Sequence, residues 1–323
     1  MIKVLAITMI AFGVGFAAAG CRSKESAAQA SGAKELALNL GDKVTMKLVQ
    51  IPAGAFLMGS LKTEKSGKDD EVPHYVTISK PFYMGITHVT VDQFAAFVKD
   101  GGYRTDAEND GWAYGVEIKD GAAEVKKVNG CSWRDPNFDQ KGDHPVVQVS
   151  WNDAQAFCDW LSKRSGTTVS LPTEAQWEYA CRAGSTTTYP WSDSPDDGKG
   201  WANCADQSLM KKLWNAPTPS AFFNWDDGFA FTSPVGCYKA NAFGLYDMIG
   251  NAWQWCQDRY GDYDAGAVTD PKGADVGSSR VLRGGSWADG PAICRSACRD
   301  ASDRNGPHGV GCIGFRVVAA SAD

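Results

Sequence analysis

Short stretches of alternating apolar and polar residues in the first third of the chain predict β-strands. Lys43–Ile51 alternates until Ala53 and Gly54 interrupt it, and Tyr75–Ile78 and Phe82–Ile86 have the length and composition of further short strands. His74 precedes one of these segments, which favours a place on a strand over a role as a metal ligand. The pattern predicts a sheet-rich N-terminal region.

Three later segments have the periodicity of amphipathic helices, with suitable residues at their ends. The expected N-terminal caps are Thr90, either Ser150 or Asn152, and Thr173, the last forming a capping box with Gln176, and the second and third helices are expected to end near Gly166 and Gly184. The expected inward-facing residues are apolar: Val91, Phe94, Phe97, Val98, Phe157, Trp160, Leu161, Trp177, Ala180 and Cys181. We interpret these side chains as core residues.

The N-terminus has the pattern of a secretory signal. Lys3 precedes an apolar run from Val4 to Ala17 that is short for a membrane span, and small residues lead into Cys21. Ala18-Ala19-Gly20-Cys21 resembles a bacterial lipobox, which implies cleavage before Cys21 and lipid attachment to it. We therefore expect a signal peptide at 1–20 and a flexible tether at 21–38. The alternative is an uncleaved signal anchor.

The remaining residues, 39–323, predict one domain with no solenoid repeat. The chain has 35 glycines and 12 tryptophans, which suits a loop-rich fold packed around aromatic side chains. Its net charge of −6 and the lack of a basic run beyond the tether argue against a nucleic-acid partner. We expect a monomer.

Nine cysteines follow Cys21, so at least one is unpaired if the others form disulfides. No CxxC or Cys/His cluster has zinc spacing, and the four histidines are scattered. The nine cysteines are Cys131, Cys158, Cys181, Cys204, Cys237, Cys256, Cys294, Cys298 and Cys312.

Four motifs give the most specific signal. They are Leu171–Gly184 (LPTEAQWEYACRAG), Gly244–Trp255 (GLYDMIGNAWQW), Gly284–Asp289 (GGSWAD) and Gly314–Arg316 (GFR). In this order and at these separations they resemble the formylglycine-generating enzyme, or sulfatase-modifying factor, family. The resemblance implies an α+β fold: a loop-rich variant of the C-type lectin fold with short antiparallel strands and a few helices. By analogy with the family, it also suggests the disulfides Cys181–Cys294 and Cys158–Cys312.

The resemblance further implies structural calcium, whose oxygen ligands irregular loops can supply. A first site would use the side chains of Asn203 and Asp227 and the carbonyls of Cys204 and Phe229. A second would use Asp247, Gly250, Ala252 and Gln254, with Asp247 and Gln254 in place of the family's usual Asn and Glu. The alternative is that Asn203 and Asp247 only cap turns.

Enzymes of this family use two cysteines that hold copper(I) to convert a sulfatase cysteine to formylglycine. Aligned on Gly284-Gly285-Ser286, the first position is Asp289 and the second is Cys294. A carboxylate is a hard ligand and cannot replace a thiolate on this ion. We therefore expect no copper and no catalytic residue; an oxidase would depend on Cys294 and Ser286. In another alignment, based on Arg295–Arg299, Cys294 is only structural.

The last 36 residues, from Ala288, contain no Lys, Glu, Gln, Met or Trp. Much of 288–312 is compatible with randomised Asn codons, and this resembles the retroelement-diversified variable proteins of the Treponema type, which are surface lipoproteins on the same scaffold. The alternative is an ordinary Gly/Ala/Asp-rich loop. The candidate ligand contacts are Ala288, Asp289, Ala292, Ile293, Cys298, Asp300, Ala301, Ser302, Asp303, His308, Gly309, Val310 and Cys312.

Three functions are consistent with these patterns. The first, which we favour, is a non-catalytic lipoprotein of the bacterial cell envelope, anchored in a membrane by its lipid, that binds a protein or carbohydrate ligand. The second is a copper-dependent oxidase that modifies sulfatases. The third is an accessory component of an envelope assembly.

Overall fold

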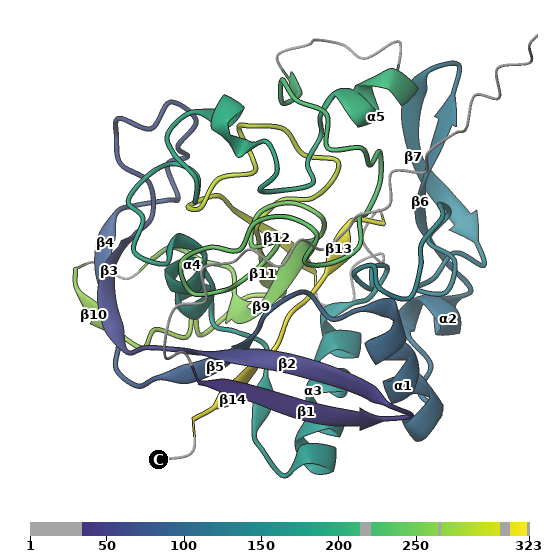
Figure 1. Ribbon diagram of the computed structural model, residues 1–323, viewed down its shortest axis with the longest axis horizontal. Coiled ribbons are helices and arrows are strands. Elements are labelled where there is room, and N and C mark those ends of the chain that lie inside the picture. Colours follow the sequence, from purple (N-terminus) through teal and green to yellow (C-terminus); the bar gives the residue numbers. More distant parts are fainter. Residues whose placement is uncertain (1–33, 214–220, 264–265, 304–310, 322–323) are drawn as a thin grey trace, which may run out of the picture.

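The computed structural model describes residues 34–213, 221–263, 266–303 and 311–321, and confirms the expected α+β class (Figure 1). The strands are short, and most of their pairings are antiparallel. They are β1 (Glu35–Gly41), β2 (Val44–Ile51), β3 (Gly54–Met58), β4 (His74–Ile78), β5 (Phe82–Gly85), β6 (Trp112–Lys119), β7 (Ala122–Asn129), β8 (Val169–Ser170), β9 (Trp253–Arg259), β10 (Val268–Thr269), β11 (Ser279–Arg283), β12 (Arg299–Asp303), β13 (Ile313–Gly314) and β14 (Val318–Ala320). The helices are α1 (Val91–Gly101), α2 (Asp106–Asp110), α3 (Trp151–Ser165), α4 (Glu174–Arg182), a 3-10 turn at Pro195–Gly198, and α5 (Gln207–Lys212).

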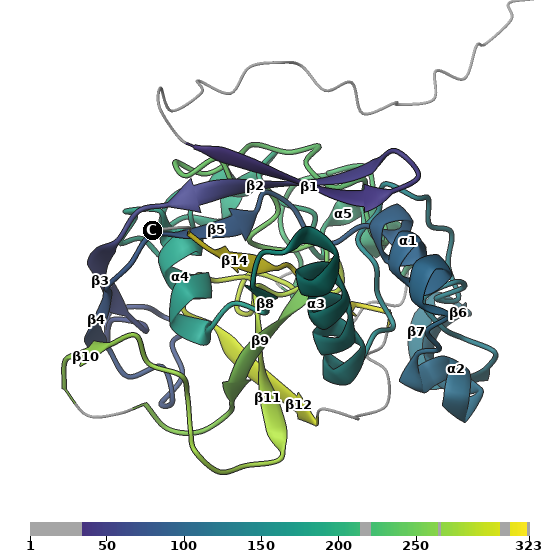
Figure 2. The ribbon, with the colours of Figure 1, turned by 90° about the horizontal axis from the view of Figure 1, so that it is seen from below.

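A five-stranded sheet in the order β1-β2-β5-β14-β8 brings the two ends of the folded region together (Figure 2). The tether assignment of 21–38 is corrected here, because Glu35 already begins β1 and pairs with Val49. Leu38 and Leu40 are 5% and 1% exposed. Their alternating burial provides the energy that orders this strand.

The three longer helices begin at the capping residues that the sequence predicted. Thr90, Ser150 and Thr173 each accept a hydrogen bond from the third helical residue and complete a capping box. Ser150, not Asn152, is therefore the cap of α3. Helix α4 stops one residue earlier than expected, since Ala183 adopts the left-handed conformation before Gly184.

One apolar core lies between α1, α3 and the five-stranded sheet. Phe94 of α1 stacks on Phe157 of α3, and Phe315 meets both rings edge-on. Trp160 also contacts Phe157, but its indole nitrogen donates to Asp100 at the surface. This core fixes the chain on either side of Gly314, from which β13 and β14 continue in different sheets.

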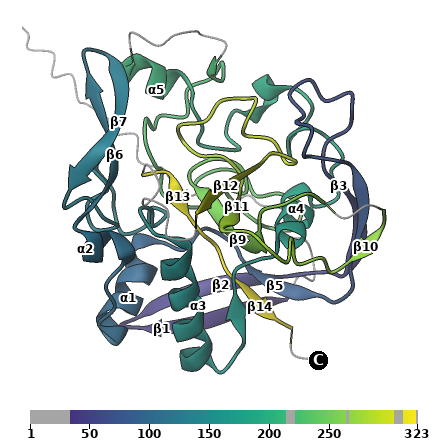
Figure 3. The same ribbon diagram turned by 180° about the vertical axis from the view of Figure 1, so that it is seen from behind.

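A second core lies around α4 and the sheet β12-β11-β9-β13, which occupies the middle of the molecule (Figure 3). Trp177 of α4 is fully buried and donates to Gln254 of β9 at 2.8 Å. The loops that carry the Gly244–Trp255 and Gly284–Asp289 motifs therefore meet beside α4.

Local patterns missed the hairpin β6–β7 and the short helices α2 and α5. Strand β7 is largely exposed, so it has no clear alternation of burial to reveal it. The expected signal peptide, Cys21 and most of the expected tether lie outside the described residues. Within the described ranges, no helix has the length and hydrophobicity needed to cross a membrane.

Candidate functional site

The candidate site is built on the tight turn that follows β11. Gly284 and Gly285 have φ values of 101° and 70°, which favour glycine. A Cβ on Gly285 would lie 2.7 Å from the Cys294 sulfur. Trp287 anchors the turn, since its buried indole nitrogen donates to the Gly311 carbonyl at 3.0 Å. The glycines thus let Cys294 pack directly against the turn.

Asp289 and Ser286 close the turn through their side chains. The Ser286 hydroxyl donates to the Asp289 carboxylate at 2.5 Å and accepts from the Ala288 amide at 3.2 Å. Burial raises the pKa of Asp289, and the hydrogen bond from Ser286 opposes this shift. Ser286 therefore serves as a turn hydroxyl and has no histidine base among these partners.

Cys294 lies beside the turn, together with a cysteine from a distant loop. Its thiol donates to the Asp289 carbonyl at 3.2 Å and is in hydrogen-bonding contact with the Cys204 thiol. Both side chains are fully buried. Burial raises the pKa of Cys204, and burial together with Cys204 raises that of Cys294. Both thiols therefore stay protonated and are poor nucleophiles.

These residues do not fit the copper pair of the formylglycine enzymes. Asp289 stands at the first position, and its carboxylate is engaged by Ser286. Among the described residues, no cluster of three or more His, Cys, Asp or Glu side chains has the arrangement of a metal site. We derive no oxidase chemistry from this set.

The first calcium loop does fit a cation. The structure gathers its four residues, because the Asp227 carboxylate accepts from the backbone amides of Cys204 and Phe229 at 3.2 and 2.8 Å. Asn203 is fully buried, and its side-chain oxygen has no hydrogen-bond partner in the structure. A buried acceptor without a donor is costly, and a calcium ion would satisfy it. Such an ion would stabilise the loop without taking part in chemistry.

The second calcium set is not arranged as expected. The Gln254 oxygen accepts from Trp177 at 2.8 Å and from Arg316 at 2.5 Å, and the guanidinium brings a positive charge to that position. The Ala252 carbonyl accepts from His88. Asp247 keeps one buried oxygen without a partner, but Gln254 is corrected to a structural residue. The amide oxygen of Gln254 is therefore occupied by the indole of Trp177 and the guanidinium of Arg316.

The candidate ligand contacts divide by exposure. Ala288, Ala292, Asp300 and Asp303 are exposed, and Asp289, Ala301 and Ser302 are partly so. Cys298 is 0% exposed and is withdrawn as a contact. Ile293 and Cys312 are partly buried and pack against the core. His308, Gly309 and Val310 lie outside the described residues.

Buried arginines hold this segment, a feature that sequence reasoning missed. Arg299 binds both oxygens of Glu174 on α4, at 2.9 and 2.8 Å. Arg295 does the same with Glu71, at 2.9 and 2.7 Å. Both arginines are about 1% exposed or less. The exposed side chains on either side of this pair, Ala288 and Ala292 before it and Asp300 and Asp303 after it, therefore project from a fixed backbone.

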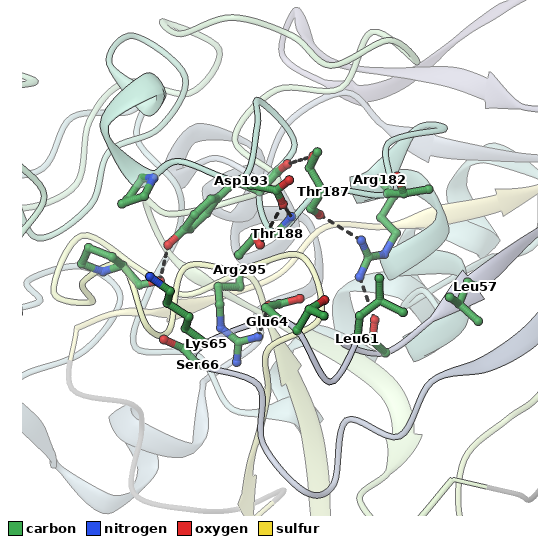
Figure 4. A pocket seen from close by; sticks show the side chains of 16 residues that line it. Leu57, Leu61, Glu64, Lys65, Ser66, Arg182, Thr187, Thr188, Asp193 and Arg295 are labelled. Atoms are coloured by element: carbon green, nitrogen blue, oxygen red, sulfur yellow. Dashed lines mark hydrogen bonds and ion pairs between the residues drawn. The ribbon is translucent and has the colours of Figure 1, made fainter.

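A cleft of about 750 Å³ adjoins the segment (Figure 4). Its walls come from the loop after β3, the loop after α4, and the chain at Pro291 and Arg295. The Arg182 guanidinium donates to the Thr187 carbonyl and the Gly59 carbonyl, and Tyr189 donates to the Pro291 carbonyl at 2.8 Å. The guanidinium groups of Arg182 and Arg295 at this cleft are bound by protein groups.

All nine described cysteines are free thiols in the structure, so neither Cys181–Cys294 nor Cys158–Cys312 is formed. For Cys294 the reason is its position beside Cys204, a residue that the family analogy did not consider.

Comparisons with known proteins agree with the fold and the motifs. A family model described as "Sulfatase-modifying factor enzyme 1-like domain" matches residues 37–321. The formylglycine-generating enzyme of Streptomyces coelicolor is 36% identical, over 84% of this chain and 88% of that protein. The "Inactive C-alpha-formylglycine-generating enzyme 2" of Bos taurus is 33% identical, over 88% and 91%.

Among solved structures, Treponema denticola variable protein 1 superposes with a TM-score of 0.65, over 89% of this chain and 99% of that one, at 22% identity. This likeness supports the expected fold.

Proposed function

Because this chain belongs to the sulfatase-modifying factor enzyme 1-like family, we propose that it is a non-catalytic member that presents a ligand-binding face from the bacterial cell envelope. The observation that carries the proposal is Asp289, which stands at the family's first copper-binding position with its carboxylate engaged by Ser286. A thiolate pair cannot form there, and copper(I) requires soft ligands.

The proposed face consists of the exposed or partly exposed residues Ala288, Asp289, Ala292, Asp300, Ala301, Ser302 and Asp303. Strand β12 pairs with β11, which leads directly into the turn, so the two parts of this face are neighbours. The buried ion pairs of Arg295 and Arg299 fix the backbone on which these side chains stand. A fixed backbone with small side chains suits recognition through several modest contacts, because little conformational entropy is lost when a ligand binds to it.

The cleft next to Pro291 supports a binding role, because a ligand that covers Ala292 could extend into it. The ligand is a protein or a carbohydrate, and calcium at Asn203 and Asp227 would be structural. Lipid attachment at Cys21 would hold the domain at a membrane surface.

The decisive experiment is a copper(I) titration of the reduced full chain with calcium present, followed by incubation with a Cys-x-Pro-x-Arg peptide under oxygen. We expect no tight one-to-one copper binding and no aldehyde in the peptide mass spectrum. The Streptomyces coelicolor relative is the positive control. Conversion of the peptide would overturn the proposal and favour the oxidase.

A glycan array then tests the face directly. We expect a ligand bound by the native protein to be lost on the substitution Ser302→Arg and retained by Asp159→Arg, which changes an exposed residue of α3. Equal loss in both variants would argue against the assigned face.

A further inference from the structure

Two buried thiols from distant parts of the chain meet beneath the candidate face. Cys204 directly follows Asn203, and Cys294 follows the Gly284–Asp289 turn. The two sulfurs are in hydrogen-bonding contact. Both side chains are 0% exposed. Neither the predicted disulfides nor the family's copper pair involves this combination.

Backbone hydrogen bonds keep the two loops in this arrangement. The Ala205 amide donates to the Asp289 carbonyl at 3.0 Å, and the Cys294 thiol donates to the same carbonyl at 3.2 Å. The Asn251 amide donates to the Asn203 carbonyl at 2.7 Å, and the Gly250 amide to the Gly284 carbonyl at 2.9 Å. These hydrogen bonds hold the two loops against each other, so the two cysteine side chains stay close together.

Glycines enclose both sulfurs tightly. A Cβ on Gly250 would lie 2.8 Å from the Cys204 sulfur, and one on Gly285 would lie 2.7 Å from the Cys294 sulfur. Both sulfurs therefore pack directly against the backbone of a neighbouring turn. A disulfide needs no added volume, because bond formation draws the two sulfurs closer.

We propose that Cys204 and Cys294 form a disulfide bond that locks the Gly284–Asp289 turn to the Asn203 loop. The two thiols lose two protons and two electrons as the S–S bond forms. The oxidant is a protein or small-molecule disulfide, which takes up both electrons and both protons as its own S–S bond is cleaved to two thiols. Exchange takes place during folding, before the sulfurs are buried, and burial then shields the bond from reductants.

The bond has two consequences for the protein. It consumes Cys294, so neither family oxidase position then carries a free thiol. It also cross-links the turn that carries Ala288 and Asp289 to the Asn203 loop, which restricts the motion of the proposed face. The same cross-link lowers the conformational entropy of the unfolded chain. The inference goes beyond the proposed function, and its test does not depend on any ligand.

Tryptic mapping tests the bond directly. The full chain from an envelope fraction is denatured in urea near neutral pH with excess N-ethylmaleimide, which alkylates free thiols, and is digested without reductant. The peptides Gly200–Lys211 and Gly284–Arg295 each contain one cysteine. We expect them as one cross-linked species, two hydrogens lighter than their sum. Alkylation of both, or linkage of Cys294 to another cysteine, would overturn the proposal.

Variants give an independent readout. Heating with a reductant should give a Tm lower by roughly 10 °C than heating without it, because unfolding exposes the bond to reduction and the bond closes a loop of about 90 residues. The control Cys158→Ala, in a buried cysteine of α3, should show the same fall. Cys204→Ala should show none, and its Cys294 should be alkylated. If Cys204→Ala fails to fold, the peptide map of the native chain still decides.

Discussion

Single atoms decide which of the family's properties this chain can retain. The Asn203 side-chain oxygen is buried without a partner, whereas the Gln254 oxygen accepts two hydrogen bonds. The first can accept a cation, and the second is already satisfied. The Asp289 carboxylate is held by Ser286, so it closes a turn where the oxidases place a thiolate.

Calcium should stabilise the protein through Asn203. We expect chelation to lower the Tm of the native protein, because the buried oxygen then loses its ligand. Asn203→Ala should abolish the calcium-dependent part of the Tm, whereas Asn109→Ala, at an exposed residue of α2, should keep it. Differential scanning calorimetry with and without calcium measures this. An equal calcium response in both variants would contradict the first site.

Asp258 should make stability depend on pH. Burial and the nearby Glu174 raise the pKa of its carboxyl from 3.8 to about 7. The folded state thus binds more protons than the unfolded state between these values, so stability falls as pH rises from about 4 to 7. The loss is at most about 4 kcal/mol.

Asp258→Asn keeps an acceptor for the Glu174 amide and should flatten this dependence in urea unfolding from pH 5 to 8. The exposed change Asp159→Asn should leave the slope unaltered. An unchanged slope in Asp258→Asn would exclude this carboxyl as the source.

At the scale of elements, helix α4 organises the site. Its Glu174 binds Arg299 at the start of β12, and its Glu178 binds Arg283 at the end of β11. Both carboxylates are at most 3% exposed. Charges in a dry interior need paired and well-oriented partners, so these contacts fix how the helix and the two strands lie against one another.

Breaking one of these pairs should be costly. We expect Arg299→Met to lower the free energy of unfolding by about 3–5 kcal/mol, because buried Glu174 loses its two hydrogen bonds from Arg299 and keeps only the longer contact with Arg283 at 3.8 Å. Arg134→Met removes an exposed ion pair with Glu108 and should cost about 1 kcal/mol or less. Urea denaturation compares the two. Adding Glu174→Gln to Arg299→Met should recover part of the loss; a larger loss in the double variant would refute the pairing argument.

At the scale of the whole molecule, the folded region begins at β1 and ends at β14, with both in one sheet. The domain therefore includes Glu35–Leu38, which the sequence had assigned to a tether, because β1 begins at Glu35.

Cys21→Ser should release the protein from membranes after expression in a bacterial host, because its lipid attachment site is lost. Fractionation and immunoblotting measure the distribution, with Cys158→Ala as the control that stays bound. Retention of Cys21→Ser in the membrane fraction would instead indicate an uncleaved anchor at Val4–Ala17.

The sequence alone determined the helix starts at Thr90 and Thr173, the strands near β2, β4 and β5, and the family, since these depend on short motifs. It missed β1 and the hairpin β6–β7, whose burial depends on distant partners.

Only the tertiary structure decided that Cys204 lies beside Cys294, that Cys298 is buried and that the Arg316 guanidinium donates to the Gln254 side-chain oxygen. The physical reason is chain connectivity. Caps and periodicity act over a few residues, whereas these contacts close loops of several tens of residues, and the packing of both cores selects which loops meet.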